Sequence, residues 1–128
     1  MACHNEDDSK EINEWLISNL EKLFHDKTNC DVTIHLPDGQ IQAHKSVLIG
    51  VPVFEAMFSS GMTESQTKTI QIVDSDVKSF EALLLFVYCG KLPGLEFDLK
   101  LAKSMLVLAK KYDVPHLLPR CLSILRKR

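Results

Sequence analysis

The chain has 128 residues, the length of a single domain, and a formal net charge of −2 at pH 7. Apolar residues make up 45% of the sequence and charged residues 25%, as in an ordinary soluble protein. These values exclude a strongly basic protein that attracts nucleic acid, and no run approaches the roughly 18 apolar residues of a membrane span. The four cysteines form no C-x-x-C pair, so we expect reduced thiols, no zinc site and an intracellular protein, in the nucleus, the cytoplasm or both.

The first predicted element is an amphipathic helix after a disordered start. Residues 1–9 show no apolar periodicity, so we expect them to be disordered. Asp8 and Glu11 have the spacing of a capping box and predict a helix that runs to about His25. Its apolar residues cover more than half of the helix circumference, which is wider than one core-facing stripe. We therefore expect either that the helix is sandwiched within its own domain or that a second subunit covers half of this face.

Three segments alternate apolar and polar residues with the period of a strand. Residues 31–36 predict the first strand, and residues 37–39 form a turn of Pro, Asp and Gly. Ile41 and Ala43 continue the alternation in a second strand, which the tight turn makes antiparallel to the first. Residues 67–73 predict the third strand.

The segment between the second and third strands predicts two short helices. Residues 47–49 form one apolar helical turn, which Gly50 stops. Pro52 suits the first position of the next helix, because its missing N–H would have no partner there. Gly61 is well placed to close that helix in the left-handed conformation.

Three longer helices follow the third strand. Asp76 and Asp98 are candidate N-caps for helices over 77–89 and from 99 to 112. Pro115 is expected to begin the last helix. Three short strands and five or six helices predict an α+β domain, in which a cluster of helices caps a small sheet.

The sequence contains none of the motifs that activate a nucleophile, hold phosphates or bind catalytic zinc. Its histidines are isolated, and His25, His35 and His116 suit solvated or capping positions better than acid–base catalysis. We therefore expect a binding module without a cofactor or metal, and not an enzyme.

An ordered set of short motifs resembles the BTB/POZ family. The motifs are Asp31-Val32, Ala43-His44-Lys45, Pro52-Val53-Phe54 with Ala56-Met57-Phe58, Met62-Thr63-Glu64, Phe86-Val87-Tyr88 with Gly90-Lys91, and Ala109 with Tyr112. The resemblance implies the BTB/POZ fold over residues 10–128, with a small three-stranded sheet, five to six helices and an N-terminal dimerisation helix. The chain is most similar to the BTB domains of MATH-BTB cullin-3 adaptors such as speckle-type POZ protein, because the polar residues before the first helix offer no apolar strand for exchange between subunits.

The resemblance implies a homodimer that forms through the first helix. The residues placed at this dimer interface are Ile12, Trp15, Leu16, Leu20 and Leu23 of the helix, together with Asp31 and Lys45. Asp31 and Lys45 are expected to lie near each other at the base of the dimer, either as a partly buried ion pair or as a pocket that a partner uses.

The resemblance also implies a second partner, the N-terminal region of cullin-3. Family adaptors carry a hydrophobic-x-Glu motif, which Met62-Thr63-Glu64 matches, and its apolar anchor would insert into a groove on the cullin. Phe58, Tyr88 and Tyr112 resemble neighbouring contact positions, although Tyr112 also suits the core. The implied function is recruitment of cullin-3 to a ubiquitin ligase complex, with a substrate receptor domain or partner protein outside this chain. The alternative is a self-association scaffold or transcriptional corepressor platform that does not bind cullin.

Overall fold

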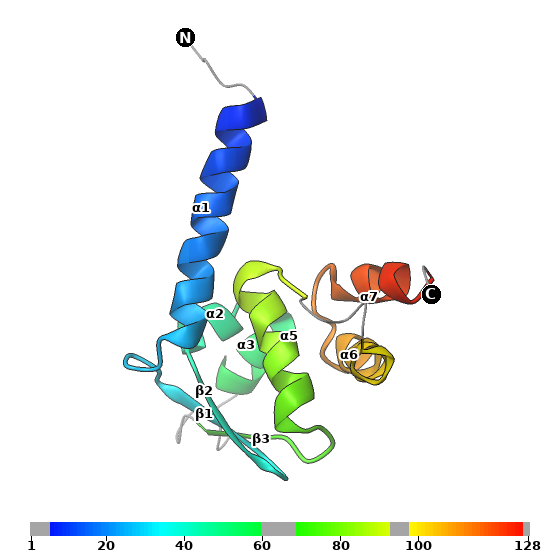
Figure 1. The fold of residues 1–128 in the computed structure, drawn as a ribbon. Helices are drawn as coiled ribbons and strands as arrows, with labels where there is room; N and C mark the ends of the chain where they lie inside the picture. Colours follow the sequence, from blue (N-terminus) through cyan, green and yellow to red (C-terminus); the bar gives the residue numbers. More distant parts are fainter. Residues whose placement is uncertain (1–5, 60–68, 93–97, 127–128) are drawn as a thin grey trace.

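The computed structural model describes residues 6–59, 69–92 and 98–126. Within these ranges, six helices and a three-stranded sheet form an α+β domain, as predicted (Figure 1). In chain order the elements are α1 (Glu6–His25), β1 (Val32–Leu36), β2 (Gly39–Ala43), α2 (Lys45–Leu48), α3 (Pro52–Ser59), β3 (Thr69–Gln71), α5 (Val77–Cys89), α6 (Leu99–Tyr112) and α7 (Leu117–Arg126). None of the described helices combines the length and apolar character needed to cross a membrane.

The central strand of the sheet is β1. It pairs with β2 in the predicted antiparallel direction, with Val32 opposite Ala43, and with β3 in parallel, with Ile34 opposite Ile70. Buried and half-buried residues alternate along β1, because successive side chains of a strand point to opposite faces. The third strand is shorter than the predicted 67–73, and residues 67 and 68 lie outside the described ranges.

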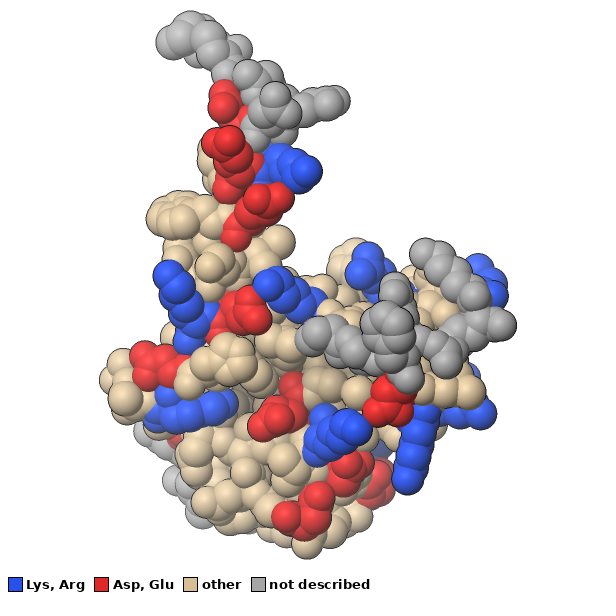
Figure 2. Space-filling view, in the orientation of Figure 1, with Lys and Arg blue, Asp and Glu red and all other residues tan. Residues whose placement is uncertain are grey.

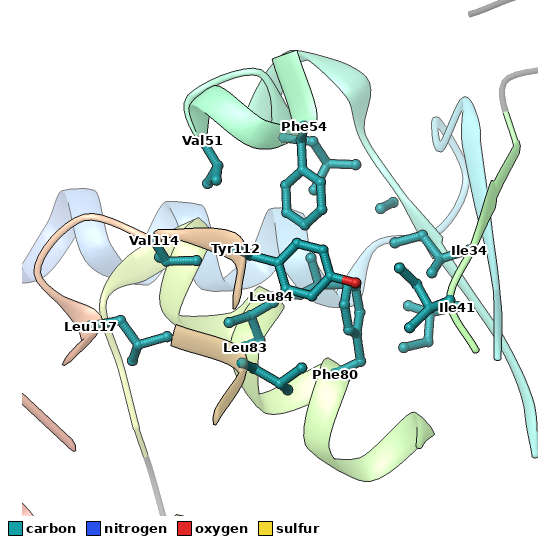
Figure 3. Packing of buried hydrophobic residues seen from close by; sticks show 14 of the residues in the cluster. Ile34, Ile41, Val51, Phe54, Phe80, Leu83, Leu84, Tyr112, Val114 and Leu117 are labelled. Atoms are coloured by element: carbon teal, nitrogen blue, oxygen red, sulfur yellow. The ribbon is translucent and has the colours of Figure 1, made fainter. Parts of the chain in front are cut away.

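The hydrophobic core lies between the sheet and the helices α3, α5 and α6 (Figure 3). Phe54 of α3, Phe80 of α5 and Tyr112 of α6 meet there and are almost fully buried. The ring centroid of Tyr112 lies 5.4 Å from that of Phe54 and 5.8 Å from that of Phe80. Aromatic pairs at such distances add about 0.5–1.5 kcal/mol each beyond the burial of their surface.

Local capping signals set the ends of α5 and the start of α6. The Asp76 carboxylate accepts a hydrogen bond from the Ser79 N–H at 3.3 Å, and the Asp98 carboxylate accepts one from the Leu101 N–H at 3.0 Å. Both predicted N-caps are therefore confirmed. Gly90 ends α5 in the left-handed conformation, with a φ of 79°.

Two predicted helix starts are wrong. The first helix begins at Glu6, so residues 6–9, which were expected to be disordered, are helical. The last helix begins at Leu117 and not at Pro115, because His116 has a φ of 68°, which an α-helix does not allow. The segment before α7 is a turn, in which the Leu117 N–H donates to the Val114 carbonyl.

Candidate protein-interaction surfaces

α1 presents an apolar face that the described part of the chain leaves uncovered. Trp15 is 63% exposed, Ile12 47%, Leu16 46% and Leu20 40%. Large apolar side chains gathered in this way on one surface are typical of an interaction site. The alternative in which α1 is sandwiched within its own domain is therefore wrong.

The C-terminal half of α1 attaches the helix to the domain by packing against α5. Phe24 is buried, and its ring contacts the ring of Tyr88 edge-on at a centroid distance of 5.2 Å. Glu21 accepts a hydrogen bond from the Lys91 ammonium at 2.5 Å, which lowers the pKa of Glu21 and raises the pKa of Lys91. Leu23 is only half-buried, so this predicted interface residue lies at the border between the core and the exposed face.

Asp31 and Lys45 lie together, as predicted, but no ion pair joins their side chains, and the alternative of a pocket that a partner uses stays a prediction. The Asp31 Oδ1 accepts a hydrogen bond from the backbone N–H of Lys45 at 2.8 Å. This N–H opens α2, whose N-cap His44 makes no capping hydrogen bond with its side chain, so Asp31 supplies the acceptor that the helix start needs. The Lys45 ammonium lies instead 5.3 Å from the centroid of the Phe58 ring.

Tyr88 is tied into the domain by His44. The backbone N–H of His44 donates to the Tyr88 hydroxyl at 2.8 Å, and the same hydroxyl forms a second hydrogen bond with His44 Nδ1 at 2.7 Å. Burial raises the pKa of Tyr88 to about 12, although the hydrogen bond from His44 acts in the opposite direction. Cys30 Sγ lies 3.9 Å from His44 Nε2, and burial raises the pKa of this thiol, which keeps it protonated.

Three of the five predicted cullin-3 contacts are core residues. Phe58 is 6% exposed, Tyr88 4% and Tyr112 3%. Side chains with so little surface offer a partner little to bind, and their direct contact with cullin-3 stays a prediction. The core alternative for Tyr112 is confirmed. Met62 and Glu64 lie outside the described residues, and their role stays a prediction.

Sequence reasoning missed an exposed apolar residue on α6. Val107 is 64% exposed, whereas most other apolar side chains of this helix are buried. The signal that could have found it is its spacing, because Val107 stands seven residues after Lys100 and four after Lys103. It therefore shares the lysine-bearing face of the helix and not the core face.

The described residues offer little for catalysis or metal binding. No group of three or more His, Cys, Asp or Glu side chains among them could hold a metal ion. An apolar groove of about 330 Å³ lies near the C-terminal end of α5, between Val47, Val87 and Val114. His116 is the one titratable side chain among its described lining residues, so the groove contains no acid–base pair.

Comparisons with known proteins agree with this architecture. Residues 20–128 match the family model of the BTB/POZ domain. TD and POZ domain-containing protein 3 of Mus musculus is 32% identical over 117 residues, which are 91% of this chain and 32% of that protein. A BTB/POZ domain-containing protein of Arabidopsis thaliana is 35% identical over 103 residues, which are 80% of this chain and 31% of that protein. The chain thus spans about a third of the length of these relatives.

A solved structure shows the same fold. The BTB domain of zebrafish PATZ1 superposes with a TM-score of 0.70, and the match covers 100% of both chains. The sequence identity of 22% is low, so this likeness concerns the fold alone.

Proposed function

This chain belongs to the BTB/POZ family, whose domains self-associate and bind partner proteins, and on that premise we propose that it is a homodimeric adaptor that recruits cullin-3 to a ubiquitin ligase complex. The substrate would be held by a receptor domain or partner protein outside these residues. Within the family, the proposal places the chain with the MATH-BTB adaptors.

The dimer is supported by the exposed apolar face of α1. Ile12, Leu16 and Leu20 follow one another at spacings of four residues and are each at least 40% exposed. In a two-fold dimer the same surface of each copy faces its counterpart, so one apolar face covers the other. A stable interface of ordinary size buries about 1,600 Å² in total, to which these side chains and Trp15 would contribute. This face of α1 is the observation that carries the proposal.

Cullin-3 recruitment is supported by the motif Met62-Thr63-Glu64, which follows α3 in the sequence. Met62 would serve as an apolar anchor, and the Glu64 carboxylate would accept hydrogen bonds beside it. With Phe58, Tyr88 and Tyr112 in the core, the motif supplies the remaining predicted contacts.

Calorimetric titration of the purified chain with the N-terminal region of cullin-3 tests the proposal. We expect the wild type to bind, and Met62→Asp and Glu64→Lys each to weaken binding by about tenfold or more, as for central interface residues. Thr63→Ala is the matched control, because the motif leaves this position open, and it should bind like the wild type. Absence of binding by the dimeric wild type would refute cullin-3 recruitment.

The second candidate function is a self-association scaffold or transcriptional corepressor platform without cullin binding. The burial of Phe58, Tyr88 and Tyr112 favours it, because it leaves these three side chains little surface for contact with cullin-3. It requires the same α1 dimer. A dimeric chain that gives no heat with cullin-3 is the result expected for this alternative.

A further inference from the structure

The N-terminal half of α1 stands clear of its own domain. Every residue from 10 to 16 is exposed, and the first half-buried residue after them is Ile17. Figure 1 shows this part of the helix projecting beyond the other elements. The packed C-terminal half of α1 already nucleates the helix, but the projecting half gains no packing of its own from the described part of the chain. Most helical stability in proteins comes from packing of an amphipathic face, so a partner surface would stabilise the projecting half of α1.

The charge of the projecting half is strongly acidic. Asp8, Glu11 and Trp15 follow one another at spacings of three and four residues, so they share one face of the helix, and Glu14 flanks them. Figure 2 shows acidic side chains gathered along this part of α1, with Lys10 as the basic exception in the segment. We call Asp8, Glu11, Glu14 and Trp15 the acidic face of α1.

α6 carries the complementary surface. It contains four lysines and no acidic residue, and Lys100, Lys103, Val107 and Lys110 recur at spacings of three and four residues on one exposed side. Lys103 and Lys110 make no hydrogen bond or ion pair within the described ranges. We call these four residues the lysine face of α6. The neighbouring α7 adds Arg120 and Arg126 and also lacks an acidic residue.

We propose that the acidic face of α1 in one copy docks on the lysine face of α6 in a second copy. The contact rests on the proposed α1 dimer and would occur twice in it, because two-fold symmetry makes each contact reciprocal. The two faces are complementary in charge and in apolar character. Carboxylates would meet ammonium groups, and the exposed Trp15 ring would meet Val107 or a lysine. The occupant is a second copy because this chain itself supplies both complementary faces.

Charge reversal tests the contact through the dissociation constant of the dimer, measured by dilution with light scattering at low salt. Glu11→Lys with Glu14→Lys, or Lys103→Glu with Lys110→Glu, should each raise this constant by about tenfold, because several exposed pairs turn from attraction to repulsion. Combining the four changes should restore the wild-type constant, as expected for residues that face each other. High salt should reduce the difference between the variants, because it screens exposed charges.

Controls distinguish loss of the α1–α6 contact from misfolding of the variants and from absence of the α1 dimer. All four positions are exposed, so the far-ultraviolet circular dichroism spectra should stay those of the wild type, and Glu81→Lys on α5 is a charge reversal that should leave the dissociation constant unchanged. A wild type that is monomeric at every concentration would overturn the proposed dimer. A wild-type dimer whose dissociation constant is insensitive to both double reversals, or is not restored by their combination, would overturn the α1–α6 contact alone.

Discussion

Individual side chains fix the region where α1, the sheet and α2 meet. Asp31 holds the first N–H of α2, and Tyr88 holds the backbone N–H of His44 immediately before it. Neither bond follows from the order of residues alone, because 14 and 44 positions separate the partners. The family motif Ala43-His44-Lys45 is thus a structural feature that positions α2.

Replacing Asp31 tests its role at the start of α2. Asp31→Ala should lower the free energy of unfolding by about 1 kcal/mol, the usual cost of a lost cap. Lys45→Met should change it by less than about 0.5 kcal/mol, because the methionine chain still covers the ring of Phe58 and no ion pair is lost. Urea unfolding measures both values. If both variants lost the same free energy of unfolding, an ion pair between Asp31 and Lys45 would be the better interpretation.

Tyr88 makes stability depend on pH in the alkaline range. Its pKa is about 12 in the folded chain, against an ordinary value of 10.0, so folding favours the neutral phenol. The corresponding stability is complete below pH 10 and disappears as the pH rises toward 12, a loss of about 3 kcal/mol. Tyr88→Phe should be less stable than the wild type at neutral pH by about 1–3 kcal/mol, because the buried His44 N–H loses its acceptor.

The same variant should lose less stability than the wild type between pH 10 and pH 12, since it has no phenol at this position to ionise. Urea unfolding across that range compares the two slopes. Tyr112→Phe is a useful second variant, because burial also raises the pKa of Tyr112 while its hydroxyl makes no bond to His44. If the free energy of unfolding fell equally with pH in the wild type and in Tyr88→Phe, Tyr88 would not be the group that causes the loss of stability.

Helix ends were predictable from sequence where a local side chain decides them. Asp76 and Asp98 each cap a backbone N–H three residues away, and Gly90 adopts a conformation that other residues avoid. The start of α7 was missed because proline is common at the first position of a helix, which made Pro115 the predicted start. In the structure the preceding turn continues through His116, whose φ is positive. The balance between such alternatives depends on packing against α6, which the sequence pattern does not record.

The candidate site was predictable only in part. Helical spacing identified the apolar positions of α1, and their excess over one core-facing stripe indicated a partner. The same kind of spacing did not distinguish an interaction residue from a core residue at Phe58, Tyr88 or Tyr112, because an aromatic side chain suits both. Tertiary packing decides that question, and it places all three inside.

A single charge placed on the apolar face of α1 should abolish dimerisation. Leu20→Asp would bury a carboxylate between two apolar surfaces, so we expect monomers at concentrations where the wild type is dimeric. Ser18→Asp is the matched control, because Ser18 is exposed on the opposite side of the helix, away from Leu20. Light scattering gives the molar mass of each variant. A dimer of unchanged stability in Leu20→Asp would show that the interface lies elsewhere.

The whole molecule separates its charges although its net charge is only −2. Acidic side chains gather on the projecting part of α1 (Figure 2), whereas α6 and α7 contain lysines and arginines and no acidic residue. The exposed apolar face of α1 lies beside the acidic end. Self-association therefore accounts for three features together: the uncovered apolar face, the unsupported half of α1 and the complementary charges.

The molar mass of the wild-type chain in solution tests self-association most directly. The chain has a mass of 14.5 kDa, and light scattering over a range of concentrations should give twice this value, with dissociation only on strong dilution. A mass of 14.5 kDa at every concentration would contradict the dimer, and with it the adaptor, the scaffold and the α1–α6 contact.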